Sequence, residues 1–325
     1  MSKSIQLTLA CGSYDINQGL IDGSVKPQGI DLTVLTYPSP QRHWRMLVHQ
    51  EFDICELSMA SYLLVHSRGS HPFIAIPAFP HRRFRHSYIF INSESGIRTA
   101  KDLEGRKVGL RTWQTTAGLW MRGILQDEYG VDLKKVQWFT QDQEDIPFTP
   151  PPGISIQLVP EGKTVTGMLE TGELDALIYP ELPEAIKRGD PRVKRLFDDY
   201  KQEEIRYFKK TGFFPIMHTV VIKNSVLEKY PWAAVNMLEA FRKSKDLAFK
   251  KMEDPRKISL AWVRELIEEQ KQVLGNDPWC YNLPDNRDAL NTMIRWSYEQ
   301  GMSSRMFPAE ELFFPPSLDE LPQYV

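Results

Sequence analysis

Short segments in which apolar and polar residues alternate recur along the chain, and each one predicts a β-strand. Between them lie stretches such as residues 117–128, where the apolar residues follow the period of an amphipathic helix. The predicted strands are residues 5–10, 30–35 and 51–56 in a first stretch, and residues 107–110, 136–139 and 173–178 in a second. Both stretches have the order strand–helix–strand–helix–strand. This order predicts an α/β protein of two lobes, each a mainly parallel sheet flanked by helices.

Two connecting segments indicate where the chain passes between these lobes. Residues 92–96 (NSESG) form a polar linker, and residues 211–215 (TGFFP) precede a strong strand over 219–222. We therefore predict three segments: lobe 1 in residues 1–93, lobe 2 in residues 94–214, and a return to lobe 1 with C-terminal helices in residues 215–325. Two crossings between α/β lobes predict a hinge and a cleft, where strand ends and helix N-termini gather ligands.

Composition excludes more functional classes than it identifies. The 325 residues are 42% hydrophobic and 25% charged, and the formal net charge of −2 gives no basic field that points to nucleic acid. The three cysteines, Cys11, Cys55 and Cys280, are far apart in the sequence. Their spacing argues against a zinc site or a disulfide framework and fits a reducing compartment. No apolar stretch approaches the roughly 18 residues of a membrane span.

The sequence begins without the long apolar segment of a secretory signal peptide. We therefore expect a cytoplasmic protein, although a mature secreted form that starts at a new methionine would look the same. We expect no nucleic-acid partner and no membrane partner. Homo-oligomer formation stays open.

A basic run, residues 81–86 (HRRFRH), lies between the apolar segments 73–76 and 88–91. Charged groups avoid apolar surroundings unless they are paired or reach solvent. Arginine offers a planar fork to a carboxylate and histidine exchanges a proton near neutral pH, so the run suits a small carboxylated ligand. On an extended backbone Arg82 and Arg85 would face opposite sides, and a turn is needed to bring them together. The alternative is a solvated turn whose arginines pair with surface acids.

Motifs spread over nearly the whole chain carry a family resemblance. They are residues 7–12 with Tyr14 and Asp15, residues 49–53 and 79–80, Arg82, and residues 84–87, 122–131, 214–222 and 297–301. In these motifs the chain resembles the family of 4,5-dihydroxyphthalate decarboxylases, which share the fold of type II periplasmic solute-binding proteins. The chain departs from the family pattern at residues 111–116 and 178–183, and at His81 and Arg83. A substrate other than a dihydroxylated phthalate therefore stays open.

The resemblance implies a demanding reaction. Removing carbon dioxide from an aromatic ring is hard because the electrons of the broken bond cannot simply stay on carbon. A ring hydroxyl ortho or para to the carboxylate offers a route, because the ipso carbon is then protonated before carbon dioxide leaves. Such an enzyme needs groups that position the carboxylate, an acid for the ring carbon, and groups that polarise the phenol. The chemistry inherently needs no metal or organic cofactor.

Four residues on these motifs are the expected centre of the site. Arg82 and Arg85 are expected to clamp the carboxylate, with Arg85 counted as catalytic, and His86 and His218 are expected to act as acid and base. Further expected ligand contacts are Phe84, Tyr14, Ser58, Arg111, Thr115 and Thr116. Most of this second group lies near helix starts, where free backbone donors attract anions. Each has a structural alternative: a structural histidine, a helix N-cap, a surface ion pair or a core aromatic ring.

We therefore predict a cytoplasmic, cofactor-independent decarboxylase that acts on a hydroxylated aromatic dicarboxylate such as 4,5-dihydroxyphthalate. The alternative is a solute-binding protein that captures a small aromatic carboxylate or sulfonate for an ABC-type transporter. Other chemistries lack their motifs, since the sequence has no GxxxxGK[ST], GxGxxG, GxSxG or HExxH.

Overall fold

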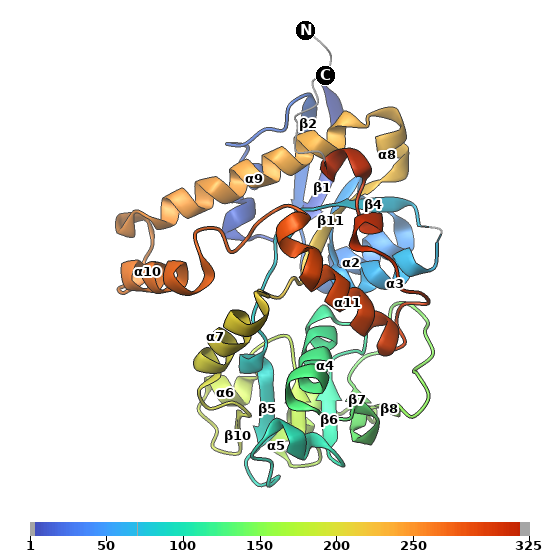
Figure 1. The fold of residues 1–325 in the computed structure, drawn as a ribbon, viewed down its shortest axis with the longest axis vertical. Helices are drawn as coiled ribbons and strands as arrows, with labels where there is room; N and C mark the ends of the chain where they lie inside the picture. Colours follow the sequence, from blue (N-terminus) through green and yellow to red (C-terminus); the bar gives the residue numbers. More distant parts are fainter. Residues whose placement is uncertain (1–3, 70, 319–325) are drawn as a thin grey trace. The chain divides into compact units, whose positions relative to one another are not determined.

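The computed structural model describes residues 4–69 and 71–318, and the chain divides into two compact units. Unit 1 comprises the described parts of Met1–Arg82, Ile216–Asn291 and Phe307–Val325, and unit 2 comprises Arg83–Pro215 and Thr292–Met306. Each unit is built on one β-sheet with helices packed against it (Figure 1). The α/β class with two lobes, predicted from the alternating elements, is confirmed.

The sheet of unit 1 has the strand order β2–β1–β3–β11–β4. Its strands are β1 (Ile5–Cys11), β2 (Ile30–Thr36), β3 (Ile54–Ser58), β4 (Phe73–Ile76) and β11 (His218–Lys223). β1 pairs in parallel with β2 and β3, whereas β11 runs antiparallel to β3 and β4. β3 lies in the middle of the sheet and all of its residues are buried. Any charged residue on β3 must therefore find its partner inside the protein.

Helices cover this sheet (Figure 1). The longest of them, α9 (Trp232–Met252), packs against α1 (Gln18–Ile21) and the 3-10 helix η1 (Asp15–Asn17). α2 (Ser39–His49) packs against β3 and so brings its buried face to the centre of the sheet. The other helices of unit 1 are α1 (Gln18–Ile21), α3 (Met59–Ser67), α8 (Asn224–Lys229) and α10 (Val263–Leu274), with the 3-10 helices η1 (Asp15–Asn17), η5 (Pro255–Lys257), η6 (Pro284–Asn286), η7 (Ala309–Leu312) and η8 (Pro315–Leu318).

The sheet of unit 2 has the order β10–β5–β9–β6–β7–β8. Its strands are β5 (Ile89–Asn92), β6 (Lys107–Leu110), β7 (Gln137–Thr140), β8 (Ile156–Leu158), β9 (Ala176–Ile178) and β10 (Val193–Arg195). β5 runs antiparallel to β9 and β10, while β6, β7, β8 and β9 pair in parallel. In each sheet, therefore, the strand that follows a crossing between the units opposes the other strands.

The helices of unit 2 are α4 (Thr116–Tyr129), α5 (Val165–Glu170), α6 (Glu184–Lys187) and α7 (Tyr200–Thr211), with the 3-10 helices η2 (His86–Tyr88), η3 (Ala100–Leu103) and η4 (Leu133–Lys135). α11 (Arg287–Glu299) begins in unit 1 and continues in unit 2. None of the described helices is both long and apolar enough to cross a membrane.

The observed division differs from the predicted segments in two places. β5 was placed at the end of lobe 1, but it belongs to the sheet of unit 2 because it pairs with β9 and β10. Residues 292–306 were placed with lobe 1, but they pack in unit 2. There the ring of Trp296 lies so close to Gly123 that an added Cβ would meet it at 2.1 Å. The period of a strand or helix does not say which sheet or partner it joins.

Candidate active site

A fully buried carboxylate, that of Glu56 on β3, is the centre of a polar cluster in unit 1. Its Oε2 accepts a hydrogen bond from the backbone N–H of Gly12 at 2.7 Å. Its Oε1 accepts one from the Tyr14 hydroxyl at 3.1 Å and lies 3.0 Å from Nη2 of Arg42. A buried carboxylate without such partners would be strongly destabilising. The cluster therefore supplies the Glu56 carboxylate with partners inside the protein and holds it in place.

Arg42 supplies the countercharge from the buried face of α2, and its side chain is as inaccessible as that of Glu56. Its Nε donates to the backbone oxygen of Glu56 at 2.9 Å, and its Nη1 donates to the backbone oxygen of Tyr37 at 2.6 Å. A longer contact of 3.4 Å joins Nη2 to Oγ of Ser39. The guanidinium is therefore fully occupied in fixing Glu56 and the turn before α2.

His218, the first residue of β11, completes the cluster. Its Nδ1 lies 2.5 Å from Oε1 of Glu56, the same oxygen that accepts from Tyr14. A carboxylate only accepts hydrogen bonds, so the network assigns the hydrogen of the neutral ring to Nδ1 and the lone pair to Nε2. A carboxylate that orients an imidazole in this way is the arrangement of an acid–base histidine.

Two further imidazoles contact His218 edge-on, His43 at 4.8 Å and His81 at 4.7 Å between ring centroids. The ring of Tyr14 lies 5.4 Å from His81 on the other side. His43 is buried, and burial holds its pKa well below the usual range, with the neighbouring His218 and Arg42 acting in the same direction. His43 is therefore a neutral ring at physiological pH.

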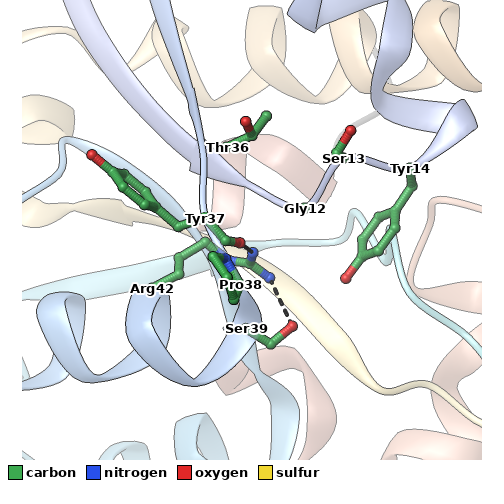
Figure 2. Close-up of a pocket in the computed structure, with 8 residues that line it drawn as sticks. All are labelled: Gly12, Ser13, Tyr14, Thr36, Tyr37, Pro38, Ser39 and Arg42. Atoms are coloured by element: carbon green, nitrogen blue, oxygen red, sulfur yellow. Dashed lines mark hydrogen bonds between the residues drawn. The ribbon is translucent and has the colours of Figure 1, made fainter. Parts of the chain in front are cut away.

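A pocket of about 330 Å³ opens beside this cluster. Its size lies at the lower end of the range for small-molecule sites. Figure 2 shows the eight residues that line it: Gly12, Ser13, Tyr14, Thr36, Tyr37, Pro38, Ser39 and Arg42. Gly12 has a steric reason to be glycine, because an added Cβ would lie 2.4 Å from the Tyr14 ring. Tyr14 thus folds back over Gly12 and joins the pocket to Glu56.

Burial raises the pKa of the Tyr14 hydroxyl above its usual range, and the charge of Glu56 adds to this effect. The charge of Arg42 offsets part of the rise. Tyr14 is therefore a neutral phenol at physiological pH, and its O–H is directed to Glu56.

The chain matches one curated protein over almost its full length and a second over part of it. It is 34% identical to the 4,5-dihydroxyphthalate decarboxylase of Comamonas testosteroni, and the match covers 98% of this chain and 99% of the relative. It is 36% identical to the 4,5-dihydroxyphthalate decarboxylase of Pseudomonas putida over 61% of this chain and 79% of that relative. The chain belongs to the 4,5-dihydroxyphthalate decarboxylase family.

The fold of this family member is that of periplasmic binding proteins. Residues 24–226 match the family model described as ABC transporter, phosphonate, periplasmic substrate-binding protein. Among solved structures, a periplasmic sulfonate-binding protein SsuA of Methylobacillus flagellatus matches with a TM-score of 0.62 at 13% identity, covering 98% of this chain and 93% of that chain. The aliphatic sulphonate binding protein SsuA of Escherichia coli matches with a TM-score of 0.57 at 12% identity, covering 96% and 98%. Identities this low show the shared fold alone, and the predicted fold is confirmed.

The predicted site residues of unit 1 lie in three settings. Tyr14 and His218 meet at Glu56, as described above. Ser58 follows on β3 and caps α3, since its Oγ accepts from the N–H of Ser61 at 3.4 Å. Arg82 is buried, and its Nη2 donates to Oδ1 of Asn286 at 2.5 Å and to the oxygen of Cys280 at 3.1 Å.

The predicted arginines and aromatic ring of unit 2 also have partners. Arg85 is buried, donates to the oxygen of Pro180 at 3.2 Å, and lies over the ring of Tyr88. Burial lowers the pKa of Arg85 to about 9. Arg111 forms an ion pair with Asp142 at 3.3 Å. The ring of Phe84 packs against that of Phe214 at 4.8 Å.

The two predicted threonines of unit 2 lie at the start of α4. Thr115 is the N-cap residue, because its Oγ1 accepts from the N–H of Gly118 at 3.2 Å, and Thr116 is the buried first residue of the helix. An N-cap hydroxyl satisfies one of the free N–H groups at a helix start. The capping alternative therefore accounts for the geometry of Thr115.

His86 begins η2 in a cluster of aromatic rings, with Phe197 and Tyr207 each 5.4 Å away and Tyr129 at 6.1 Å. It is fully buried, and neither ring nitrogen has a hydrogen-bond partner among the described residues. Burial lowers its pKa to about 4, although Glu203 offsets part of the shift. His86 is therefore a neutral ring near pH 7.

The buried His86 is expected to make stability depend on pH. Because its folded-state pKa is about 4 and an unfolded histidine titrates near pH 6.5, the unfolded state gains protons first as the pH falls. Stability is full above pH 6.5 and is lost progressively down to about pH 4, by roughly 3 kcal/mol in all. We expect His86→Phe to flatten this slope. Urea midpoints between pH 7.5 and 4.5 measure it.

The control for this variant is His49→Gln, which changes an exposed histidine at the end of α2. It should leave the pH dependence as in the wild type. An equally steep slope in His86→Phe and the wild type would contradict the buried, neutral assignment of His86.

Four residues of the cluster were not predicted as site residues: Glu56, Arg42, His43 and His81. Glu56 carried a signal in the sequence, since a charged residue at the end of the predicted strand 51–56 needs a partner. The adjacent Arg42 and His43 lie on the apolar side of α2. Only the contact of α2 with β3 brings the two signals together. Among the described residues no cluster of histidine, cysteine, aspartate or glutamate has the form of a metal site.

Proposed function

We propose that this protein is a decarboxylase that removes carbon dioxide from a hydroxylated aromatic dicarboxylate such as 4,5-dihydroxyphthalate. The observation that carries the proposal is the 34% identity with a protein of that name over 98% of this chain and 99% of the relative. The coupled Tyr14, Glu56 and His218 side chains supply the acid–base group that this chemistry requires.

The reaction balances as follows. A base takes the proton of a ring hydroxyl para to the departing carboxylate, and the oxygen electron pair forms a carbon–oxygen double bond. Formation of this double bond displaces a pair of ring electrons, which binds a proton at the ipso carbon. The bond to the carboxylate then breaks, its electron pair restores the aromatic ring, and carbon dioxide leaves. The phenol regains its proton, so one carboxylate and one proton give one C–H bond and one carbon dioxide.

In this scheme His218 takes and returns the proton of the ring hydroxyl through Nε2. Glu56 is a positioning residue. A hydrogen bond from Nδ1 to an ionised carboxylate fixes the ring orientation and stabilises the imidazolium that forms on proton uptake. Arg42 supplies the countercharge of the Glu56 carboxylate at a distance of 3.0 Å. We propose that the ring hydroxyl itself serves as the electron reservoir and that the enzyme works without a cofactor.

The proposal extends to location and to the remaining predicted site residues. We propose that the enzyme acts in the cytoplasm, in keeping with three free cysteines, of which Cys11 and Cys55 are buried. The roles of Arg82 and Arg85 in holding carboxylates, and of Phe84, His86, Arg111 and the α4 threonines in ligand contact, stay predictions. Homo-oligomer formation also stays a prediction.

The test is incubation of the purified protein with 4,5-dihydroxyphthalate in D2O. We expect release of carbon dioxide and formation of 3,4-dihydroxybenzoate that carries deuterium at the former carboxylate position. Unsubstituted phthalate is the control, because without a ring hydroxyl its ipso carbon has no electron source and it should release no carbon dioxide. Absence of carbon dioxide from both compounds would contradict the proposal.

A second candidate function is binding of a small carboxylate or sulfonate without chemistry. The match of residues 24–226 to a periplasmic substrate-binding family model favours it. The same incubation separates the two candidates, since a binding protein leaves the dihydroxyphthalate unchanged while a thermal shift still reports binding.

A further inference from the structure

We propose that the pocket of unit 1 binds the two adjacent ring hydroxyls of the substrate and not its carboxylates. The inference rests on the proposed function for the identity of the substrate, but it concerns which end of the molecule enters this pocket. It assigns a catechol-binding subsite to the residues drawn in Figure 2.

The charge of the pocket disfavours a carboxylate. Arg42 is the only cationic residue among the eight that line it. Its guanidinium is paired with the buried Glu56 at 3.0 Å and also donates to two backbone oxygens and, more weakly, to Ser39. Arg42 and Glu56 together carry no net charge. A carboxylate in contact with these residues would therefore lose part of its hydration without gaining a cation of its own.

The direction of the hydrogen bonds at Tyr14 favours a phenolic hydroxyl over a carboxylate. The Tyr14 hydroxyl gives its one hydrogen to Oε1 of Glu56, and its oxygen also interacts with the side chains of Arg42 and Ser39, so it has no hydrogen left to donate to a ligand. A carboxylate is likewise acceptor-only and would oppose the Tyr14 oxygen, whereas a phenolic hydroxyl has a hydrogen to donate. The hydroxyls of Ser13, Thr36 and Ser39 in the lining both donate and accept, as a second ring hydroxyl requires.

Tyr14 is linked to His218, the proposed acid–base group, and this link also favours a hydroxyl in the pocket. Tyr14 and His218 share Oε1 of Glu56, so a ligand hydroxyl bound at Tyr14 lies next to the group that exchanges its proton. In 4,5-dihydroxyphthalate the two hydroxyls lie on the ring edge opposite the two carboxylates. Ser13, Thr36 and Pro38 of the lining are exposed, so the pocket opens to solvent. Entry of the hydroxyl edge first leaves the carboxylate edge outside the lining residues.

The experiment titrates the full-length protein with three ring compounds by calorimetry or ligand-observed NMR. The three compounds are catechol, 1,2-dimethoxybenzene and phthalate. 1,2-Dimethoxybenzene has the same ring as catechol but no O–H donors. We expect catechol to bind at least tenfold more tightly than 1,2-dimethoxybenzene, and Tyr14→Phe to weaken catechol at least fivefold while leaving phthalate unchanged. Tyr298→Phe, at an exposed position in α11, is the matched control and should change neither.

Equal affinities for catechol and 1,2-dimethoxybenzene would overturn the proposal, as would a Tyr14→Phe variant that loses phthalate and keeps catechol. The comparison of ligands on the wild type needs no variant, so it holds even where Tyr14→Phe fails to fold. A carbon dioxide assay on the same preparation separates the two claims. Tyr14-dependent catechol binding without decarboxylation supports the subsite and contradicts the proposed function. If the protein releases carbon dioxide but its affinity for catechol is unchanged in Tyr14→Phe, only the subsite proposal is overturned.

Discussion

Replacement of Glu56 by glutamine is expected to lower the free energy of unfolding by about 3 kcal/mol, because it leaves the guanidinium of Arg42 buried without its countercharge. The loss comes from the charge and not from the shape, since glutamine has the same size and its carbonyl oxygen still accepts one hydrogen bond. Turnover is expected to fall at least tenfold as well, because His218 loses the carboxylate that fixes its ring. Urea denaturation followed by circular dichroism measures the first effect.

The matched control is Glu51→Gln, which removes a second ion pair with an arginine of the same helix, Arg45. The Glu51 side chain is 42% exposed, so water replaces the lost partner and the unfolding midpoint should stay nearly unchanged. Equal changes in the two variants would show that burial does not govern the Arg42–Glu56 pair. A double variant that also replaces Arg42 by methionine should recover part of the loss, because it removes the unpaired charge.

The sequence predicted the elements of the fold better than their assembly. The alternating segments 5–10 and 30–35 are strands β1 and β2 almost to the residue. The lobe boundary at the polar linker 92–96 placed residues 88–91 with lobe 1, whereas β5 joins the sheet of unit 2 through partners far away in the sequence, in β9 and β10. Periodicity is a local property, whereas sheet membership depends on long-range pairing.

The basic run shows why a local pattern misjudges a site. On an extended chain residues 82–86 alternate faces. Here Arg82 forms an isolated bridge with Ile216, Arg85 is not extended because its ψ is −9°, and His86 already begins a 3-10 helix. Arg82 belongs to unit 1 and Arg85 to unit 2, so each is fixed by its own set of acceptors. The run marks a crossing between units, and its charges are explained by partners that no spacing rule identifies.

In the polar cluster the single residues predicted little from the sequence. Their contacts in the fold are what identify the candidate site. His218 and Tyr14 were predicted separately from family motifs, 204 positions apart in the printed sequence. Glu56 joins them because β3 lies between β1 and β11 in the sheet. Strand order therefore creates the site, and strand order is the quantity that local patterns do not contain.

Replacement of His218 by glutamine is expected to lower kcat by roughly 10²–10⁴-fold, the usual contribution of a positioned acid–base group. Glutamine retains a donor for Glu56 and a similar length, but it cannot take up a proton at the position of Nε2. KM is expected to change little, because Tyr14 and the other lining residues of the proposed subsite are untouched. Initial rates with 4,5-dihydroxyphthalate, followed by carbon dioxide release, give both constants.

The control for this variant is again His49→Gln, at an exposed histidine outside the pocket lining, which should retain wild-type kinetics. The pH profile adds a readout that a purely structural role would not move, because loss of the titrating imidazole should remove one limb of the rate profile. A His218→Gln variant with unchanged kcat and a raised KM would show that His218 holds the substrate and that another group exchanges the proton. Since Oε1 of Glu56 also accepts from Tyr14, the result would then direct the assignment to the tyrosine side of the cluster.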